Sequence, residues 1–142
     1  MEAREFLQRL RRLNITISQK EQELDFLRGQ AEYRGYSMDG VPGSSSTTDT
    51  MGNYAAKIVD AERELAADKA NLLELREEVV NAIQTLDDPT CADLLYRRYV
   101  LCESWKTIAA DMQYSHKHVS YFLHRKALKK LNTLLHEKVK AF

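Results

Sequence analysis

The side chains best suited to chemistry lie close together toward the C-terminal end of this 142-residue sequence. Between Ser115 and Arg125 the chain carries hydroxyl, imidazole, ammonium and guanidinium groups within about three helical turns. Groups of these kinds donate hydrogen bonds to base edges and phosphates of duplex DNA. The candidate DNA-binding residues are Lys106, Ser115, His116, Lys117, His118, Ser120, Tyr121, His124, Arg125, Lys129 and Lys130.

These candidates divide into two roles. A helix that begins at Ser115 presents its first exposed side chains to the major groove, so Lys117, His118 and Tyr121 are the first choices for contacting bases. The basic residues on either side would hold phosphates, which gives affinity and salt dependence without sequence choice. That second group contains Lys106, Arg125, Lys129 and Lys130. The competing interpretation is an ordinary solvated helix face.

The segment Ser104–Leu131 has the spacing of a helix-turn-helix. Ser104 and Ser115 are suited to cap its two helices, and Ala109 is small enough for the helices to cross closely. The two helices share an apolar set: Trp105, Ile108, Ala109, Met112, Tyr114, Val119, Phe122, Leu123, Ala127, Leu128 and Leu131. Gln113 occupies the turn position where glycine is usual, so a left-handed residue is expected there at a cost of about 1 kcal/mol.

A further helix over Thr90–Leu101 is expected to complete this bundle. Asp88 is a suitable N-cap, and Pro89 fits the first helical turn. The apolar residues predicted to be buried on it are Leu94, Leu95, Tyr99 and Val100.

The N-terminal half carries two heptad series, the pattern of helices that pack lengthwise. The first comprises Phe6, Leu10, Leu13, Ile17, Lys20, Leu24, Leu27 and Ala31, and the second comprises Ile58, Ala61, Leu65, Asp68, Leu72, Leu75, Val79, Ala82 and Leu86. Antiparallel pairing in one register sets Lys20 opposite Asp68, the charged position of each series. We interpret this pair as fixing the register, since mispairing would set a charge against leucine. Alternatively both charged groups extend to water.

The sequence therefore predicts an all-α protein: a long antiparallel coiled-coil hairpin over residues 1–88, followed by a helix-turn-helix bundle over 89–142. A Gly-, Ser- and Thr-rich flexible loop is expected over 36–52. Five apolar residues outside the strict heptad series suggest a second interface: Leu7, Ile15, Phe26, Leu73 and Val80. A second copy of the chain and RNA polymerase are the candidate protein partners.

Charge is unevenly distributed although the net charge is zero. Residues 1–88 carry 11 basic against 17 acidic residues, and residues 89–142 carry 10 against 4. The basic half is therefore the one expected to meet a polyanion. No apolar run reaches the roughly 20 residues that span a bilayer, and two cysteines fit a reducing compartment, so a cytoplasmic protein is expected.

Enzymatic and metal sites are not expected. No nucleophile–base set, glycine-rich phosphate loop or recognisable pair of catalytic carboxylates is present, which predicts no catalytic residues and no cofactor. His116, His118, Cys91 and Cys102 could suggest zinc. However, residues two apart on a helix point in different directions, and no C-x-x-C accompanies them.

The stretch I-A-A-D-M-Q-Y-S-H-K-H-V, followed by R-K-A-L-K-K-L, resembles the C-terminal helix-turn-helix (region four) of bacterial sigma factors. With G-N-Y-A-A-K-I-V-D, L-D-D-P, L-L-Y-R-R-Y and W-K-T-I-A, the whole chain resembles late-operon regulators of Gram-positive phages and prophages of the ArpU and RinA type. This resemblance implies a sequence-specific activator of phage late genes in a bacterial host cell. One departure is an extra residue between Val119 and Ala127, relative to the sigma pattern.

Two other functional classes fit the same pattern. A phage DNA-packaging recognition subunit, like a small terminase, also joins a helix-turn-helix to coiled helices. A coiled-coil interaction module would use the bundle to bind protein instead of DNA. Oligomeric state and a DNA-binding assay separate these alternatives.

Overall fold

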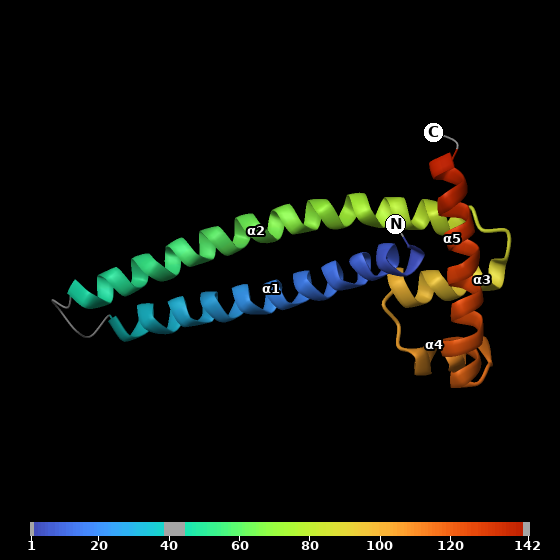
Figure 1. The fold of residues 1–142 in the computed structure, drawn as a ribbon. Coiled ribbons are helices and arrows are strands. Elements are labelled where there is room, and N and C mark those ends of the chain that lie inside the picture. The colour runs from blue at the N-terminus through green and yellow to red at the C-terminus, as the bar shows by residue number, and fades with distance from the viewer. Residues whose placement is uncertain (1, 39–44, 141–142) are drawn as a thin grey trace. The chain divides into compact units, whose positions relative to one another are not determined.

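The computed structural model describes the backbone of residues 2–38 and 45–140, and the side chains of residues 2–33 and 52–138. It is all-α, with two long antiparallel helices followed by a small helical bundle, as predicted (Figure 1). The helices are α1 (Ala3–Met38), α2 (Ser45–Gln84), α3 (Pro89–Leu95), α4 (Trp105–Met112) and α5 (His124–Lys140). Two π-helical turns adjoin these helices. The turn η1 (Tyr96–Val100) follows α3, and the turn η2 (His118–Leu123) precedes α5. No helix in the described residues is long and apolar enough to cross a membrane.

The chain forms two compact units. One is Asn14–Asn71, which holds the larger parts of α1 and α2. The other combines Met1–Leu13 with Leu72–Phe142. The core of this second unit therefore continues across residue 88, where the sequence pattern predicts a domain boundary. The reason is that the ends of α1 and α2 bury apolar side chains among the C-terminal helices.

In the unit Asn14–Asn71, α1 and α2 pair in the predicted register. Nζ of Lys20 lies 2.5 Å from a carboxylate oxygen of Asp68, and the hydrogen bond and charge of Asp68 raise the pKa of Lys20. Leu24 and Leu65 are buried between the helices. Both members of the charged pair stay partly exposed, at 33% and 21% of their side chains. They therefore contact each other at the edge of the interface between α1 and α2, and neither side chain extends fully to water.

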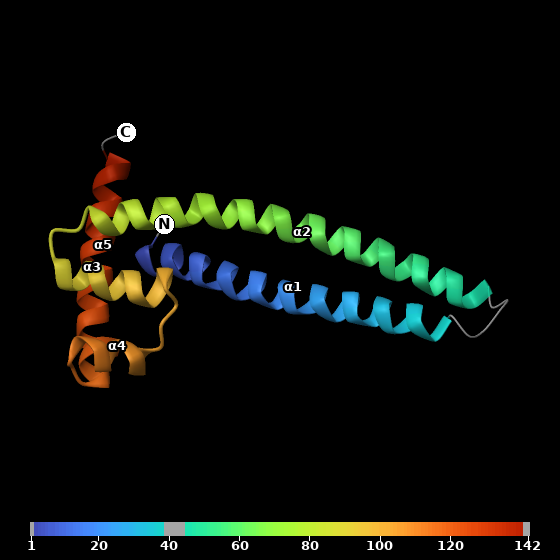
Figure 2. The same ribbon diagram turned by 180° about the vertical axis from the view of Figure 1, so that it is seen from behind.

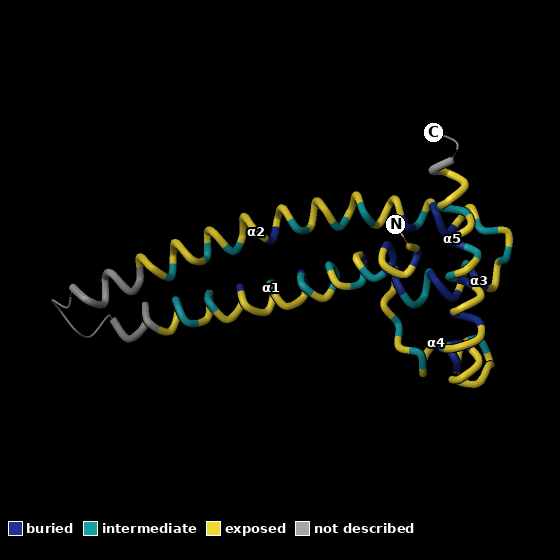
Figure 3. The backbone as a smooth tube through the Cα atoms, viewed as in Figure 1, coloured by how far each residue is buried: buried dark blue, intermediate teal, exposed yellow. Residues whose placement is uncertain are grey.

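Two further ion pairs support this register. Arg28 contacts Glu62 at 2.8 Å, and Lys69 contacts Glu21 at 3.0 Å. All described heptad residues of both series are buried or half-buried. Figure 3 shows this as dark and teal segments on the facing sides of α1 and α2, with exposed residues on their outer sides.

The loop predicted over residues 36–52 is shorter in the structure. Helix α1 continues to Met38 and α2 begins at Ser45, while residues 39–44 lie outside the described part. The Ser, Thr and Gly content favoured a loop, but a single glycine such as Gly52 costs a helix only about 1 kcal/mol. Neither proline of the sequence falls within α1 or α2, so nothing there forces an earlier end.

In the second unit, one apolar core joins the start of α1, the end of α2 and the C-terminal helices (Figure 2). Leu7, which we expected to face outward, is fully buried in this core. The backbone N–H of Ala3 donates to Oδ1 of Asn132 on α5 at 2.6 Å.

As predicted, Asp88 caps α3: its carboxylate accepts hydrogen bonds from the N–H groups of Thr90 and Cys91. The Cys91 hydrogen bond holds the pKa of Asp88 at about 2.

Candidate nucleic-acid interface

The predicted helix-turn-helix is present as α4, a two-residue turn and the helical segment that begins after Ser115. Oγ of Ser104 accepts a hydrogen bond from the N–H of Thr107, which caps α4. Oγ of Ser115 accepts from the N–H of His118 at 3.1 Å, which caps the second helix. Both capping predictions are confirmed. The remaining unpaired N–H groups of that first turn give its end a partial positive charge.

Gln113 adopts the left-handed conformation that the sequence predicts. Its φ and ψ angles are 61° and 39°. The N–H of the next residue, Tyr114, then donates to the carbonyl oxygen of Ala109 at 3.0 Å, which closes the end of α4. This sharp reversal allows the second helix to begin directly at Ser115.

The helix after Ser115 contains a π-helical turn, η2, and this changes which side chains face the core. Val119, Leu123, Ala127 and Leu131 are buried. They repeat every four residues, a longer step than the 3.6 residues of an α-helical turn, and the wider π turn compensates for the drift.

Two sequence predictions are wrong because of this turn. Phe122 was expected in the core and is 57% exposed. His124 was expected to contact DNA and is buried, with only 9% of its surface exposed. A regular α-helix would instead bury Phe122 and expose His124. His124 therefore does not lie on the exposed surface of the candidate contacts.

His124 instead joins three elements of the bundle. Its Nε2 lies 2.7 Å from the hydroxyl oxygen of Tyr99 on η1, and its ring meets Trp105 on α4 edge-on, with centroids 4.8 Å apart. The guanidinium of Arg98 lies over the Trp105 ring, 4.4 Å from its centroid. Burial, with smaller contributions from Arg4 and Arg98, lowers the pKa of His124 to about 4. The imidazole is therefore neutral in the folded protein near pH 7.

Most of the remaining base-contact candidates lie on an exposed surface at the start of the second helix. His116, Lys117 and His118 are exposed, and so is Lys106 on α4. Ser120 is half-buried, and its hydroxyl donates to the carbonyl oxygen of His116 at 2.8 Å. Lys117 lies in the first turn of this capped helix and has no ion-pair partner among the described side chains.

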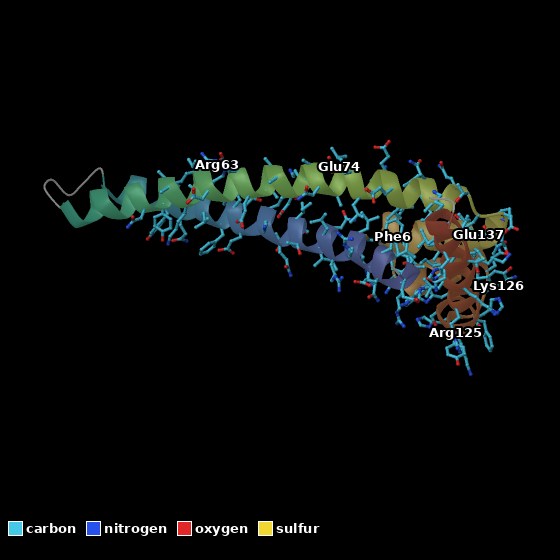
Figure 4. All side chains as sticks on the ribbon, turned by 45° about the horizontal axis from the view of Figure 1, so that its top comes forward. Phe6, Arg63, Glu74, Arg125, Lys126 and Glu137 are labelled. Carbon is cyan, nitrogen blue, oxygen red and sulfur yellow. The ribbon has the colours of Figure 1, made fainter. Side chains whose placement is uncertain are left out.

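Tyr121 and Arg125 form an exposed pair one turn further along. Nη1 of Arg125 donates to the hydroxyl oxygen of Tyr121 at 2.8 Å, and the guanidinium lies 5.0 Å from the ring centroid. The contact fixes both side chains on one face, and Figure 4 shows Arg125 near the beginning of α5. A guanidinium held in this way retains donors that could bind a phosphate or a base edge.

The three lysines farther along α5 are not equivalent. Lys129 is exposed and has no ion pair in the described part of the chain. Lys130 lies 3.6 Å from carboxylate oxygens of both Asp87 and Asp88. Burial lowers the pKa of Lys130, but these two carboxylates outweigh it and the pKa is raised. Lys126 also contacts Asp88, at 3.5 Å. Lys130 was predicted as a phosphate contact, and its charge is already compensated within the bundle.

An exposed group of aromatic rings, which the sequence pattern did not predict, lies around η2. The ring centroids of Tyr114 and His118 are 4.7 Å apart, and those of Tyr121 and Phe122 are 5.3 Å apart. His118 and Phe122 are 6.2 Å apart, which links the two pairs. The available signal was the four-residue spacing of Val119, Leu123, Ala127 and Leu131, which exceeds the 3.6 residues of an α-helical turn.

The two cysteines and the histidines considered for zinc do not form one group. Cys91 is buried in the core and Cys102 is exposed, while His116 and His118 lie at the start of the second helix. Among the described residues, no three metal-ligating side chains gather at one place.

No protein-family model, curated protein or solved structure matches this chain.

Proposed function

We propose that this protein is a sequence-specific DNA-binding transcriptional regulator that contacts the major groove with the helix beginning at Ser115. The observation that carries the proposal is the helix-turn-helix with a capped, exposed second helix. Its first turn presents Lys117 next to the N–H groups left unpaired at the helix end. The Lys117 ammonium and the unpaired N–H groups at this exposed helix N-terminus both favour a polyanionic ligand.

The distribution of charge and burial supports duplex DNA as the ligand. Lys106, Lys117, Arg125 and Lys129 are exposed, and they lie in the half of the chain whose net charge is +6. The buried residues Val119 and Leu123 set the opposite side of the same helix against the bundle. One helix thus combines a fixed inner side with a basic outer side.

The activating role is the further part of the proposal, and it follows the resemblance to phage late-operon regulators. In that interpretation the acidic hairpin is the surface that contacts RNA polymerase. The setting would be the promoter of a phage or prophage late operon in a bacterial cell.

A mobility-shift assay tests the DNA-binding proposal. A preferred duplex is first selected from a random pool, and binding is then compared with an unselected duplex at near-physiological salt. We expect the preferred duplex to bind at least about a thousandfold more tightly. Lys117→Ala should weaken binding to that duplex by roughly 1–3 kcal/mol. Equal affinity for both duplexes would contradict sequence-specific binding.

Protein binding by the same bundle is a second candidate function. The exposed aromatic group of Tyr114, His118, Tyr121 and Phe122 favours it, because aromatic residues are enriched at protein interfaces. A bundle of this kind would shift no duplex even at low salt, where non-specific DNA binding is strongest. The mobility-shift assay at low salt therefore separates the two functions.

A further inference from the structure

A second heptad series runs along the outer side of α2, distinct from the series that packs against α1. Its positions alternate by four and three residues, as a lengthwise helix contact requires. In chain order it comprises Val59, Arg63, Ala66, Ala70, Leu73, Glu77 and Val80. We call this series the outer stripe of α2.

The hairpin leaves most of the outer stripe exposed. Val59 is 50% exposed and Leu73 is 68% exposed. Arg63, Ala66, Ala70 and Glu77 are also exposed, and Val80 is half-buried. In Figure 4 the side chain of Arg63 extends from α2 on the side away from α1. Val59 and Leu73 are therefore apolar side chains left exposed on this face of α2.

The charges of the outer stripe are placed symmetrically. Arg63 comes seven residues before Ala70, and Glu77 comes seven residues after it. Neither Arg63 nor Glu77 has a charged partner in the described residues. The stripe therefore carries one positive and one negative charge, each at the same distance from a small central residue.

This symmetry selects one arrangement of two copies. If two α2 helices pack antiparallel with Ala70 opposite Ala70, Arg63 of each copy lies opposite Glu77 of the other. The same register sets Val59 near Val80, and Ala66 near Leu73. A parallel pair would instead place like charges together at both positions, which is destabilising.

We propose that the outer stripe of α2 is a self-association surface that joins two copies of this chain antiparallel, about a two-fold axis at Ala70. Such a contact is isologous, because the same residues face one another from both copies. Ala66 and Ala70 allow the helix axes to approach closely. Val59, Leu73 and Val80 provide the apolar area, and two symmetric ion pairs fix register and direction. The proposal concerns association alone and does not depend on DNA binding.

Sedimentation velocity over a series of concentrations, without DNA, tests this inference on the full chain. The wild type should form a dimer. Arg63→Glu and Glu77→Arg each turn two attractions into two repulsions, so each should weaken dimerisation by about tenfold or more. The double variant with both changes should dimerise like the wild type, because its charges are again complementary. The two single variants, when mixed, should also pair with each other.

A matched control variant and a measurement of helix content distinguish lost association from lost folding. Glu74→Arg makes the same charge change as Glu77→Arg, one turn away on the neighbouring face, and should leave dimerisation nearly unchanged. Circular dichroism should show the same helix content in all variants. A wild type that stays monomeric at every concentration would overturn the proposal. A double variant that fails to recover would overturn the antiparallel register, and a ring-sized oligomer would contradict a closed dimer.

Discussion

The hydroxyl oxygen of Tyr99 and Nε2 of His124 lie 2.7 Å apart inside the bundle, where one hydrogen bond joins η1 to the start of α5. Each residue sits in or beside one of the two π-helical turns. The burial of Tyr99 and of His124 thus depends on both departures from α-helical geometry. The contact also explains why an imidazole on the second helix of a helix-turn-helix faces inward.

The buried imidazole predicts a pH-dependent stability. The folded pKa of His124 is about 4, below the ordinary value of 6.5. Between these values the unfolded chain binds a proton that the folded protein does not, so the free energy of unfolding falls as pH falls through this window. The stabilisation is complete above about pH 6.5, and the loss is at most on the order of 3 kcal/mol. Urea unfolding at about pH 7 and pH 4.5 measures it.

A variant pair isolates the contribution of His124. His124→Gln removes the titrating group and should reduce the pH dependence of the unfolding free energy. His136→Gln, at an exposed histidine on α5, should leave that dependence as in the wild type. Equal pH dependence in the wild type and His124→Gln would show that this imidazole is not the group responsible.

The charged pair in the hairpin predicts a reciprocal substitution effect. Lys20→Asp alone should lower the melting temperature, since two carboxylates then meet at the seam. Asp68→Lys alone should do the same with two ammonium groups. Exchanging both charges should recover most of the loss, although Glu64, 3.7 Å from Lys20, then repels the carboxylate introduced at that position. Thermal unfolding of the four proteins measures the coupling, and a double variant no better than the worse single one would contradict the register.

The turn predicts a stabilising substitution. Gln113 has a φ of 61°, which costs a residue with a side chain about 1–2 kcal/mol. Glycine avoids that cost but loses more backbone entropy on folding, about 0.5–1 kcal/mol. Gln113→Gly should therefore raise the free energy of unfolding, by up to about 1.5 kcal/mol. Gln113→Val should lower it, because a β-branched residue tolerates this conformation poorly. Chemical denaturation measures the change in unfolding free energy of both variants, and the m-value should stay unchanged.

Patterns with one strong period predicted much of the fold. The two heptad series set the antiparallel register, because a one-position slip would expose leucines and separate Lys20 from Asp68. The caps at Asp88, Ser104 and Ser115 were also predictable, since each has a side-chain oxygen directly before a helical pattern. Local chemistry alone determines such features.

The contact surface was harder to predict, because one π turn changes every assignment after it. An α-helical period places Phe122 inside and His124 outside, and the structure reverses both. The partial neutralisation of Lys130 was also hidden, since Asp87 and Asp88 meet α5 only after the chain folds back. Leu7 illustrates the same limit, because its burial depends on a bundle that begins more than 80 residues later.

The difference between Lys129 and Lys130 gives the last prediction, which concerns DNA affinity. Both are neighbouring lysines on α5, but only Lys130 already contacts two carboxylates in the described part of the chain. Lys129→Ala should weaken binding to preferred and unselected duplexes alike, and should reduce the slope of log affinity against log salt by about one. Lys130→Ala should change that slope much less, because its charge is partly compensated before DNA binds. Mobility shifts over a salt series measure both slopes. Equal losses for the two variants would show that Lys130 leaves its acidic partners to contact phosphate.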